Sequence, residues 1–248
     1  MSQNVLVVHG GGPTAVINAS LYGVIEEAKR NPEVGKVYGA IGGTGAIFSE
    51  TFIDLTSFDD EKLKLLLHTP ASAIGSSRYP LYEKDYEKMV DIFKKHDIKY
   101  VLLNGGNGTM DACGHIYEVC KDQDIKVVGI PKTIDNDIAM TDHSPGYGSA
   151  ARFIAASTQE VGEDVKSLPI HVCIMEAMGR NAGWITAASA LARRKQGDAP
   201  HLIYLPERNF NEDEFLEDVS RLQKKQGGVV VLVSEGLHDA NGESIVPP

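Results

Sequence analysis

Short runs of apolar residues alternate along this chain with longer segments in which apolar residues recur every three or four positions. The runs are continuous rather than alternating with polar residues, which is typical of parallel strands buried on both faces. They predict strands over residues 5–8, 37–40, 100–103, 126–130, 171–175, 202–205 and 228–233. The periodic segments predict helices over residues 14–30, 86–96, 109–121, 149–163, 183–192 and 212–225.

This alternation of strands and helices with short loops is the pattern of an α/β protein. A polar stretch at residues 138–146, IAMTDHSPG, lies between two predicted elements and marks a boundary. We therefore expect two Rossmann-like three-layer α/β/α domains with mostly parallel sheets and a cleft between them. The predicted domains are residues 1–140 and 141–248, and a chain of 248 residues is long enough to bury a core in each.

The overall charge and composition exclude some classes of partner. The formal net charge of −10 argues against nucleic acid or an anionic membrane as the main partner, although a local basic cluster can still bind an anionic small molecule. No apolar run approaches the roughly 18 residues that a membrane span needs. The three cysteines, Cys113, Cys120 and Cys173, lack metal-ligand spacing, so we expect reduced buried thiols in a cytoplasmic protein.

The loops that follow the predicted strands carry most of the chemistry of the chain. They read HGGGPT, LNGGNGT, GIPKTIDND, MEAMGRNAG and VSEG. Because ligands of open parallel sheets bind outside the carboxyl ends of the strands, we expect these loops to gather at one edge. Their glycines, amides, acids, lysine and arginine predict a site for phosphates, a metal and a hydroxylated substrate.

Two of these loops are rich in glycine and precede helices. Gly10, Gly11 and Gly12 allow backbone N–H groups to approach an anion, although a tight turn with nothing bound explains them equally well. In the second loop, Gly108 has no side chain to obstruct a polyphosphate, while Asn107 supplies a side-chain oxygen. The first loop has neither the spacing of a Walker A motif nor that of a GxGxxG fingerprint.

The loop PKTIDND predicts the reaction centre. Asp135 is the candidate base, because a kinase base accepts a proton from the attacking hydroxyl. Asp137 is placed to hold magnesium directly or through water, and Lys132 to offset charge on a transferring phosphoryl group. The alternative is a surface turn with a solvated salt bridge.

Three further charged residues are candidates by position. Arg180 offers a planar fork for a phosphate or a sugar, and the Glu235 carboxylate can accept hydrogen bonds from sugar hydroxyls. Arg78 lies in an irregular stretch, where binding a phosphate and pairing with an acid are equally compatible with the sequence. Single arginines and glutamates are usually solvated, so the position at a strand end carries these assignments.

Taken together, HGGGPTAVINAS, GSSRYP, NGGNGTMD, GIPKTIDND, PGYGSAA, MEAMGRNAGW, YLPE and VSEG, in this order, resemble the phosphofructokinase family. The similarity runs along essentially the whole chain, and it is greatest to the branch that holds pyrophosphate-dependent enzymes and their ATP-using relatives. The resemblance implies a glycolytic phosphotransferase, a 6-phosphofructokinase that phosphorylates the 1-hydroxyl of fructose 6-phosphate. It also implies Mg²⁺ and a homodimer or homotetramer that shares substrate sites between subunits.

The resemblance assigns roles residue by residue. It implies a donor-binding domain in 1–140 and a sugar-phosphate domain in 141–248, with Asp135, Lys132 and Arg180 as catalytic residues and Asn107 and Asp137 as metal ligands. The expected donor-binding residues are Gly11, Arg78, Tyr79, Gly106, Asn107, Gly108 and Thr109. The expected substrate-binding residues are Thr133, Ile134, Asp135, Asp137, His171, Met178, Gly179, Arg180 and Glu235.

The sequence departs from the family pattern at several positions. Many members carry aspartate where Asn107 stands, and bacterial ATP enzymes carry an arginine where His171 stands, reaching a neighbouring subunit's sugar phosphate. Members also continue past the last strand with basic residues that hold the 6-phosphate, so we expect a chain that is short at its C-terminus. Gly108 leaves room for the ATP α-phosphate and Lys132 is typical of pyrophosphate users. We favour ATP, because ATP cannot bind unless that space is open.

Three readings of the function therefore compete. The first is a 6-phosphofructokinase that uses ATP, with strict pyrophosphate dependence as the alternative. The second is a phosphotransferase similar to NAD or lipid kinases, which share a GG-x-GT loop but lack MGRNAGW and PKTIDND. The third is a catalytically silent subunit that binds a nucleotide or a sugar phosphate, suggested by Asn107 and His171.

Overall fold

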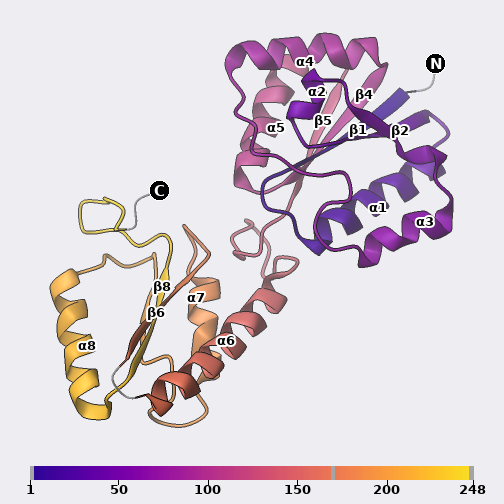
Figure 1. The fold of residues 1–248 in the computed structure, drawn as a ribbon. Helices are drawn as coiled ribbons and strands as arrows, with labels where there is room; N and C mark the ends of the chain where they lie inside the picture. The colour runs from indigo at the N-terminus through magenta and orange to yellow at the C-terminus, as the bar shows by residue number, and fades with distance from the viewer. Residues whose placement is uncertain (1–2, 169–170, 246–248) are drawn as a thin grey trace. The chain divides into compact units, whose positions relative to one another are not determined.

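Two separate sheets organise the chain, as the ribbon in Figure 1 shows. The structure is a computed structural model, and it describes residues 3–168 and 171–245. The chain divides into two units between Thr133 and Ile134, seven residues before the boundary expected after residue 140. The polar stretch 138–146 therefore belongs to the second unit, where it leads into a helix.

The first unit is built on a five-stranded sheet in the order β3-β2-β1-β4-β5. The strands are β1 (Gln3–Gly10), β2 (Val34–Ala40), β3 (Phe52–Asp54), β4 (Ile98–Gly105) and β5 (Lys126–Pro131). All neighbours are parallel except β2 and β3, which run antiparallel. The four parallel strands are those predicted, whereas β3 has three residues and is too short to show a periodic signal.

Helices cover both faces of this sheet (Figure 1). The elements α1 (Ala15–Arg30) and α3 (Asp60–Lys64) lie on one face, and α2 (Gly45–Phe48), α4 (Glu83–Lys95) and α5 (Asn107–Cys120) on the other. Alternate residues of β1 point to opposite faces of the sheet and belong to different cores. Val7 packs with α1, whereas Leu6 packs with α4 and α5. The expected three layers are therefore present, although the short helices α2 and α3 were not predicted.

The second unit repeats this plan with a parallel three-stranded sheet in the order β6-β8-β7. Its strands are β6 (Val172–Ala177), β7 (Leu202–Tyr204) and β8 (Val229–Ser234). One face carries α6 (Tyr147–Ser167), and the other carries α8 (Glu212–Gln226) (Figure 1). The predicted helix 183–192 is α7 (Trp184–Ala188) followed by a 3₁₀ turn. The central strand β8 is buried throughout, which explains its unbroken apolar run GVVVLV.

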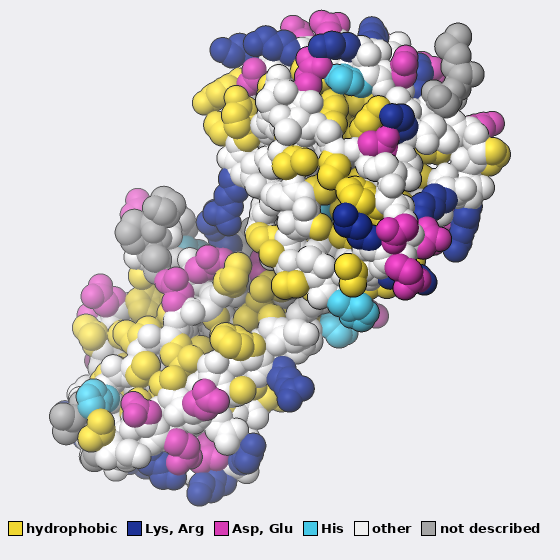
Figure 2. Space-filling model, turned by 45° about the vertical axis from the view of Figure 1, so that its right-hand side comes forward, with side chains coloured by type: hydrophobic (Ala, Val, Ile, Leu, Met, Phe, Trp, Pro, Cys, Tyr) yellow, Lys and Arg dark blue, Asp and Glu magenta, His cyan; other side chains and the backbone are white. Residues whose placement is uncertain are grey.

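Two of the three cysteines are buried, as expected. All three cysteines are free, and burial raises the pKa of Cys113 and raises that of Cys120 to about 11, so both thiols stay protonated near neutral pH. Cys173 is half-buried rather than fully buried. Lys and Arg side chains are interspersed with Asp and Glu over the visible surface of both units (Figure 2). No helix in the part of the chain that the structure describes is long and apolar enough to cross a membrane.

Candidate active site

The carboxyl end of the first sheet contains a pocket of about 380 Å³, which we call the unit-1 pocket. Seven residues that the sequence assigned to donor binding line it, drawn from three separate segments of the chain. The full lining is Gly10, Gly11, Thr44, Ser77, Arg78, Tyr79, Leu81, Gly106, Asn107, Gly108, Thr109 and Ala112. The loops after β1 and β4 therefore meet as expected, together with the irregular stretch around Arg78.

Backbone contacts bring Arg78 to this pocket. The Gly11 N–H donates to the carbonyl of Ser77 at 3.1 Å, and the Ser76 hydroxyl donates to the carbonyl of Gly11 at 2.6 Å. Gly11 adopts a φ of +72°, which favours glycine at this turn. These contacts fix segment 76–78 against the end of β1, so Arg78 lines the pocket. Sequence patterns alone left its role open, because the contact joins segments more than sixty residues apart.

The other wall of the pocket is the N-terminus of α5. Gly106 is the residue before the helix, and Asn107 and Gly108 are exposed in its first turn. A helix N-terminus presents unpaired N–H groups and the positive end of the helix dipole, which together favour a bound anion. A Cβ atom built on Gly108 meets no heavy atom within 4 Å. The space beside this glycine is therefore open, which is compatible with the expected role of Gly108 in admitting a polyphosphate.

Thr109 has a packing role that the sequence did not suggest. Its side chain is buried against the glycines that end β1 and β4. A Cβ atom on Gly105 would lie 2.7 Å from Thr109 Cβ, and one on Gly10 would lie 3.2 Å from the same atom. The two glycine turns therefore close around one threonine, which fixes their spacing.

Lys132 reaches the first glycine turn from the end of β5. The side chain is buried, and its ammonium donates a hydrogen bond to the carbonyl of Gly12. The Lys132 backbone N–H donates to the carbonyl of Gly105 at 2.8 Å, which continues the β4–β5 pairing by one residue. The structure thus places the Lys132 charge beneath the glycine turn of the first unit, and it is held there by backbone as well as side-chain contacts.

His9, a residue that the sequence did not single out, lies beside this lysine. The imidazole is fully buried, and its Nδ1 lies 2.8 Å from the Ser72 hydroxyl. Burial first, and the Lys132 charge second, lower the pKa of His9 from its ordinary value of 6.5 to about 4. The imidazole is therefore neutral at physiological pH.

This buried histidine predicts a pH-dependent stability. The unfolded chain binds the His9 proton near pH 6.5 and the folded chain only near pH 4, so stability is complete above pH 6.5 and is lost as pH falls towards 4. The full difference corresponds to about 3 kcal/mol. Urea unfolding of wild type and His9→Asn between pH 4 and 7 measures this effect. The slope of the unfolding free energy against pH should be shallower in the variant. Parallel slopes would contradict this origin of the pH dependence.

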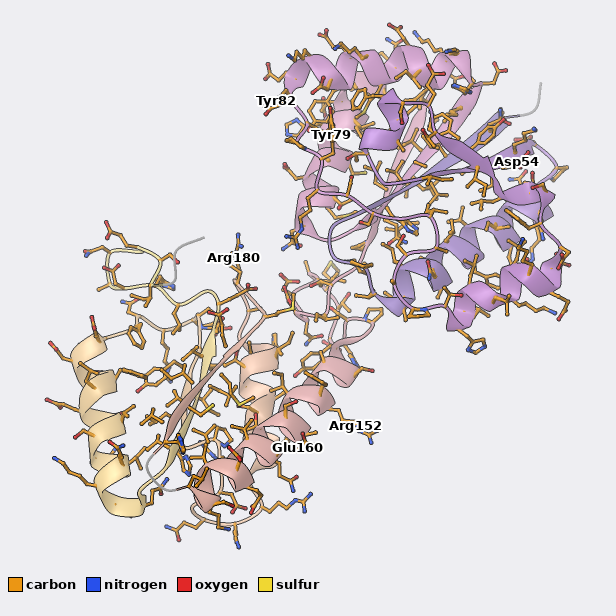
Figure 3. The ribbon with its side chains drawn as sticks, in the orientation of Figure 1. Asp54, Tyr79, Tyr82, Arg152, Glu160 and Arg180 are labelled. Carbon is orange, nitrogen blue, oxygen red and sulfur yellow. The ribbon has the colours of Figure 1, made fainter. Side chains whose placement is uncertain are left out.

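The second unit contains a pocket of about 650 Å³ at the carboxyl ends of β6 and β8, which we call the unit-2 pocket. Two of the predicted substrate-binding residues, Arg180 and Glu235, line it. The full lining is Glu176, Arg180, Asn181, Pro206, Glu235, Gly236, Leu237, His238, Gly242 and Ser244. Arg180 is exposed in the turn after β6, and its side chain extends away from the sheet (Figure 3).

Glu235 also shapes the turn that carries Arg180. One carboxylate oxygen, Oε1, accepts the Gly179 N–H at 3.1 Å, and the Ser234 hydroxyl donates to the Gly179 carbonyl at 2.9 Å. Gly179 has a φ of +115°, a conformation open to glycine alone at low cost. Hydrogen bonds therefore join Glu235 to the turn that contains the predicted residues Gly179 and Arg180. Ser234 also bonds to this turn, and sequence reasoning missed that residue. Met178 is exposed and does not line the pocket.

Asn136 organises the loop that carries the two candidate aspartates. It is buried with a φ of +62°, and its Oδ1 accepts the Ser144 N–H at 2.7 Å while its Nδ2 donates to the Asp142 carbonyl at 3.3 Å. Asn tolerates this left-handed conformation better than most residues. Asp135 and Asp137 flank it and are half-buried. In the sequence, the position of Asn136 between Asp135 and Asp137 was the available indication of this role.

The proposed catalytic residues come from both units. Lys132 and Thr133 close the first unit, whereas Ile134, Asp135 and Asp137 open the second. The expected meeting of Lys132 and Asp135 with Arg180 around one phosphoryl group stays a prediction.

His171 lies at the opposite end of β6 from Arg180. It precedes the first residue of this six-residue strand, is exposed, and has Nδ1 2.9 Å from the Leu168 carbonyl. A strand of that length spans about 20 Å. His171 therefore does not join the unit-2 pocket of its own chain, and the assignment to a neighbouring subunit's substrate stays a proposal.

Comparison with known proteins decides the family of this fold and these pockets. Residues 4–246 match the family described as Phosphofructokinase. This chain belongs to the phosphofructokinase family. The resemblance of its loop motifs to that family is thereby confirmed, and so is the α/β fold class, which phosphofructokinase structures share.

Individual family members show how far the likeness extends. The chain is 44% identical over 98% of its length to a pyrophosphate–fructose 6-phosphate 1-phosphotransferase of Rhodospirillum rubrum, covering 60% of that protein. A pyrophosphate-dependent phosphofructokinase structure from Nitrosospira multiformis superimposes with a TM-score of 0.84 at 38% identity, covering 98% of this chain and 63% of that one. An ATP-dependent 6-phosphofructokinase of Amycolatopsis methanolica is 30% identical over 95% of the chain and is covered over 52% of its own length. The chain thus spans about three fifths or less of the length of these relatives.

Proposed function

We propose that the whole protein is a 6-phosphofructokinase that transfers a phosphoryl group from ATP or pyrophosphate to the 1-hydroxyl of fructose 6-phosphate. The unit-1 pocket is the observation that carries this proposal. Its glycine turn, its arginine and the N-terminus of α5 form an anion-binding surface, which suits the donor phosphates. Arg180 and Glu235 in the unit-2 pocket supply a cation and a carboxylate for a sugar phosphate.

In the proposed reaction, Asp135 accepts the proton of the sugar 1-hydroxyl as its oxygen attacks the terminal phosphorus of the donor. The new oxygen–phosphorus bond forms as the bond to the leaving phosphate breaks, and the leaving group retains that electron pair. Lys132 and Arg180 offset the negative charge carried by the phosphoryl oxygens during transfer. The remaining donor-binding residues hold the phosphates in line with the attacking oxygen, with no covalent role.

Mg²⁺ is the metal that we propose for this reaction. The described residues contain no group of three or more His, Cys, Asp or Glu side chains suited to a metal ion. This fits magnesium bound to a substrate, because Mg²⁺ keeps several waters and takes phosphate oxygens with only one or two protein ligands. Asn107 and Asp137 are the proposed protein ligands. When bound, Mg²⁺ would neutralise part of the phosphate charge.

The identity of the donor depends on Gly108. No side chain at this position obstructs the α-phosphate of ATP, and the space for a Cβ atom there is open, which favours ATP as a donor. Pyrophosphate is the second candidate, because relatives at 44%, 40%, 40% and 37% identity bear names that specify pyrophosphate. Initial rates of the full-length protein with fructose 6-phosphate and each donor separate the two, and activity with pyrophosphate alone would overturn ATP.

The substitution Gly108→Asp tests this role directly. The added carboxylate fits the open space and repels the ATP α-phosphate, so we expect ATP affinity to fall by about tenfold or more, on the scale of a close charge pair near a protein surface. Pyrophosphate affinity should change far less. Gly114→Asp is the matched control, since it adds the same charge to α5 at an exposed glycine that also has no heavy atom within 4 Å. Equal losses of ATP affinity in both variants would contradict the proposal.

Assembly and location also belong to the proposal. We propose a homodimer or homotetramer in the cytoplasm, with fructose 6-phosphate and the phosphoryl donor as its small-molecule partners. A catalytically silent binding subunit remains the competing hypothesis, and metal-dependent turnover of the full-length protein would exclude it. The family match does not support the reading based on NAD or lipid kinases.

A further inference from the structure

Two buried polar atoms beneath the glycine turn of the first unit lack a hydrogen-bond partner among the residues that the structure describes. They are Nε2 of His9 and Oδ1 of Asn104. Both residues are fully buried, and they are the penultimate residues of β1 and β4. Buried polar atoms are nearly always paired, so two adjacent exceptions at a strand end call for a functional explanation.

The surrounding contacts show that both atoms are hydrogen-bond acceptors. Ser72 donates its hydroxyl proton to the Gly75 carbonyl at 2.7 Å, so its oxygen receives the proton on His9 Nδ1. The neutral imidazole then has a bare lone pair on Nε2. The amide nitrogen of Asn104 donates to the Ile17 carbonyl at 3.0 Å, which fixes Oδ1 as the free end of that amide.

Strand register places both acceptors on the same face as Lys132. His9 is the direct partner of Asn104 in the β1–β4 pairing, and Asn104 is the partner of Ile130 in the β4–β5 pairing. Since side chains alternate along a strand, Lys132, two residues after Ile130, returns to that face. The row therefore runs from His9 through Asn104 to Lys132.

The orientation of the imidazole supports the same arrangement. Gly10 pairs with Gly105 of β4 on one side and forms a bridge with Ser77 on the other, so segment 72–77 lies on the side away from β4. His9 Nδ1 points to Ser72 on that side. The two ring nitrogens of an imidazole point in roughly opposite directions, which turns Nε2 towards Asn104 and Lys132. The Lys132 charge is close enough to help lower the pKa of His9.

We propose that His9 and Asn104 are positioning residues that form a neutral acceptor floor for the Lys132 ammonium beneath the donor phosphates. This inference rests on the proposed role of Lys132 in phosphoryl transfer. Neutral acceptors direct the ammonium without cancelling its charge, whereas a carboxylate in the same place would compete with the incoming phosphate. The floor thus offers two neutral acceptors to a buried cation beneath a polyphosphate donor.

Paired substitutions of His9 in the full-length protein test the floor through the dissociation constant of magnesium pyrophosphate, measured by calorimetry. Asparagine keeps a donor near Nδ1 for Ser72 but removes the Nε2 acceptor, whereas glutamine places an amide oxygen near Nε2. We expect His9→Asn to weaken binding about tenfold, within the range of measured side-chain couplings, and His9→Gln to restore most of it. In a Lys132→Met background, His9→Asn should cause no further loss.

The outcomes separate this inference from the proposed function. An equal effect of His9→Asn with and without Lys132 would overturn the floor while leaving the role of Lys132 intact. Unchanged affinity in Lys132→Met alone would instead remove Lys132 from donor binding, and the proposed mechanism with it. Urea unfolding of each variant reports loss of folding. If His9→Asn does not fold, Asn104→Leu replaces it: removing the neutral Oδ1 acceptor should weaken binding in the presence of Lys132 but not in Lys132→Met, and the same loss in both would overturn the floor.

Discussion

Replacing Asp135 with asparagine in the full-length protein is expected to lower kcat by about 10²-fold or more, the usual contribution of a general base. The amide keeps the size of the side chain but cannot accept the proton of the sugar 1-hydroxyl. Affinity for fructose 6-phosphate should stay within about threefold, because the substitution leaves the hydrogen bonds of Asn136 within this loop intact. Steady-state kinetics and sugar binding measured separately check the two halves of this expectation.

Asp142→Asn is the matched control for this experiment. Asp142 lies in the same loop, is exposed, and contributes its backbone carbonyl rather than its carboxylate to the contact with Asn136. The control should therefore keep near wild-type kcat. Unchanged turnover in Asp135→Asn, or an equal loss in the control, would remove Asp135 from the role of base.

Gly236→Ala is expected to cause a severe loss of stability in the second unit. A Cβ atom at this position would lie 2.5 Å from the carbonyl carbon of Arg180 and 2.8 Å from its Cα atom, and would overlap the carbonyl oxygen between them. Both sides of the clash are backbone, so no side-chain rotation relieves it. We expect a destabilisation above about 3 kcal/mol, since overpacking against a rigid backbone is one of the few causes of values this large. Urea unfolding measures this loss of stability, and fructose 6-phosphate binding measures the effect on the unit-2 pocket.

Gly148→Ala provides the comparison within the same unit. Its Cβ would meet only His143 ring atoms at 3.4 Å and 3.5 Å, and the position lies in the first turn of α6. Alanine in a helix is typically favoured over glycine by about 0.5–1 kcal/mol, so this variant should be neutral or slightly stabilised. A Gly236→Ala protein as stable as Gly148→Ala would show that the turn after β6 has another available conformation.

The regular elements of both sheets were predictable because hydrophobic periodicity encodes burial directly. The run GVVVLV indicated β8 since both of its faces are covered, and the spacing of Tyr86, Met89, Val90 and Phe93 indicated the buried face of α4. The strand β3 and the helices α2 and α3 escaped this reasoning. Each has only three to five residues, which is too short for a periodic pattern to appear. Their conformation depends on packing against the rest of the unit.

The candidate site was predictable where chemistry followed a strand directly. Gly106, Gly108 and Lys132 were singled out because the carboxyl ends of parallel strands gather at one edge, and the structure places Gly106 and Gly108 in one pocket there. His9 and Asn104 were not found, because within an apolar strand each reads as an ordinary polar interruption. Their side chains become neighbours only through the register between two strands that are nearly a hundred residues apart in the sequence. The free nitrogen of His9 is known only once Ser72 is seen beside the other one. No local sequence pattern contains either fact.

The Glu235 carboxylate limits how substrate preference can change in this protein. The same group that faces the unit-2 pocket also accepts the Gly179 N–H and so sets the turn from which Arg180 projects. Under the proposed function, a substitution of Glu235 that changes recognition of the sugar should therefore also move Arg180, the residue proposed to bind its phosphate. New specificities in this family member should arise more readily through His238, which lines the same pocket and whose ring lies against the Gly236 carbonyl rather than the Gly179 N–H.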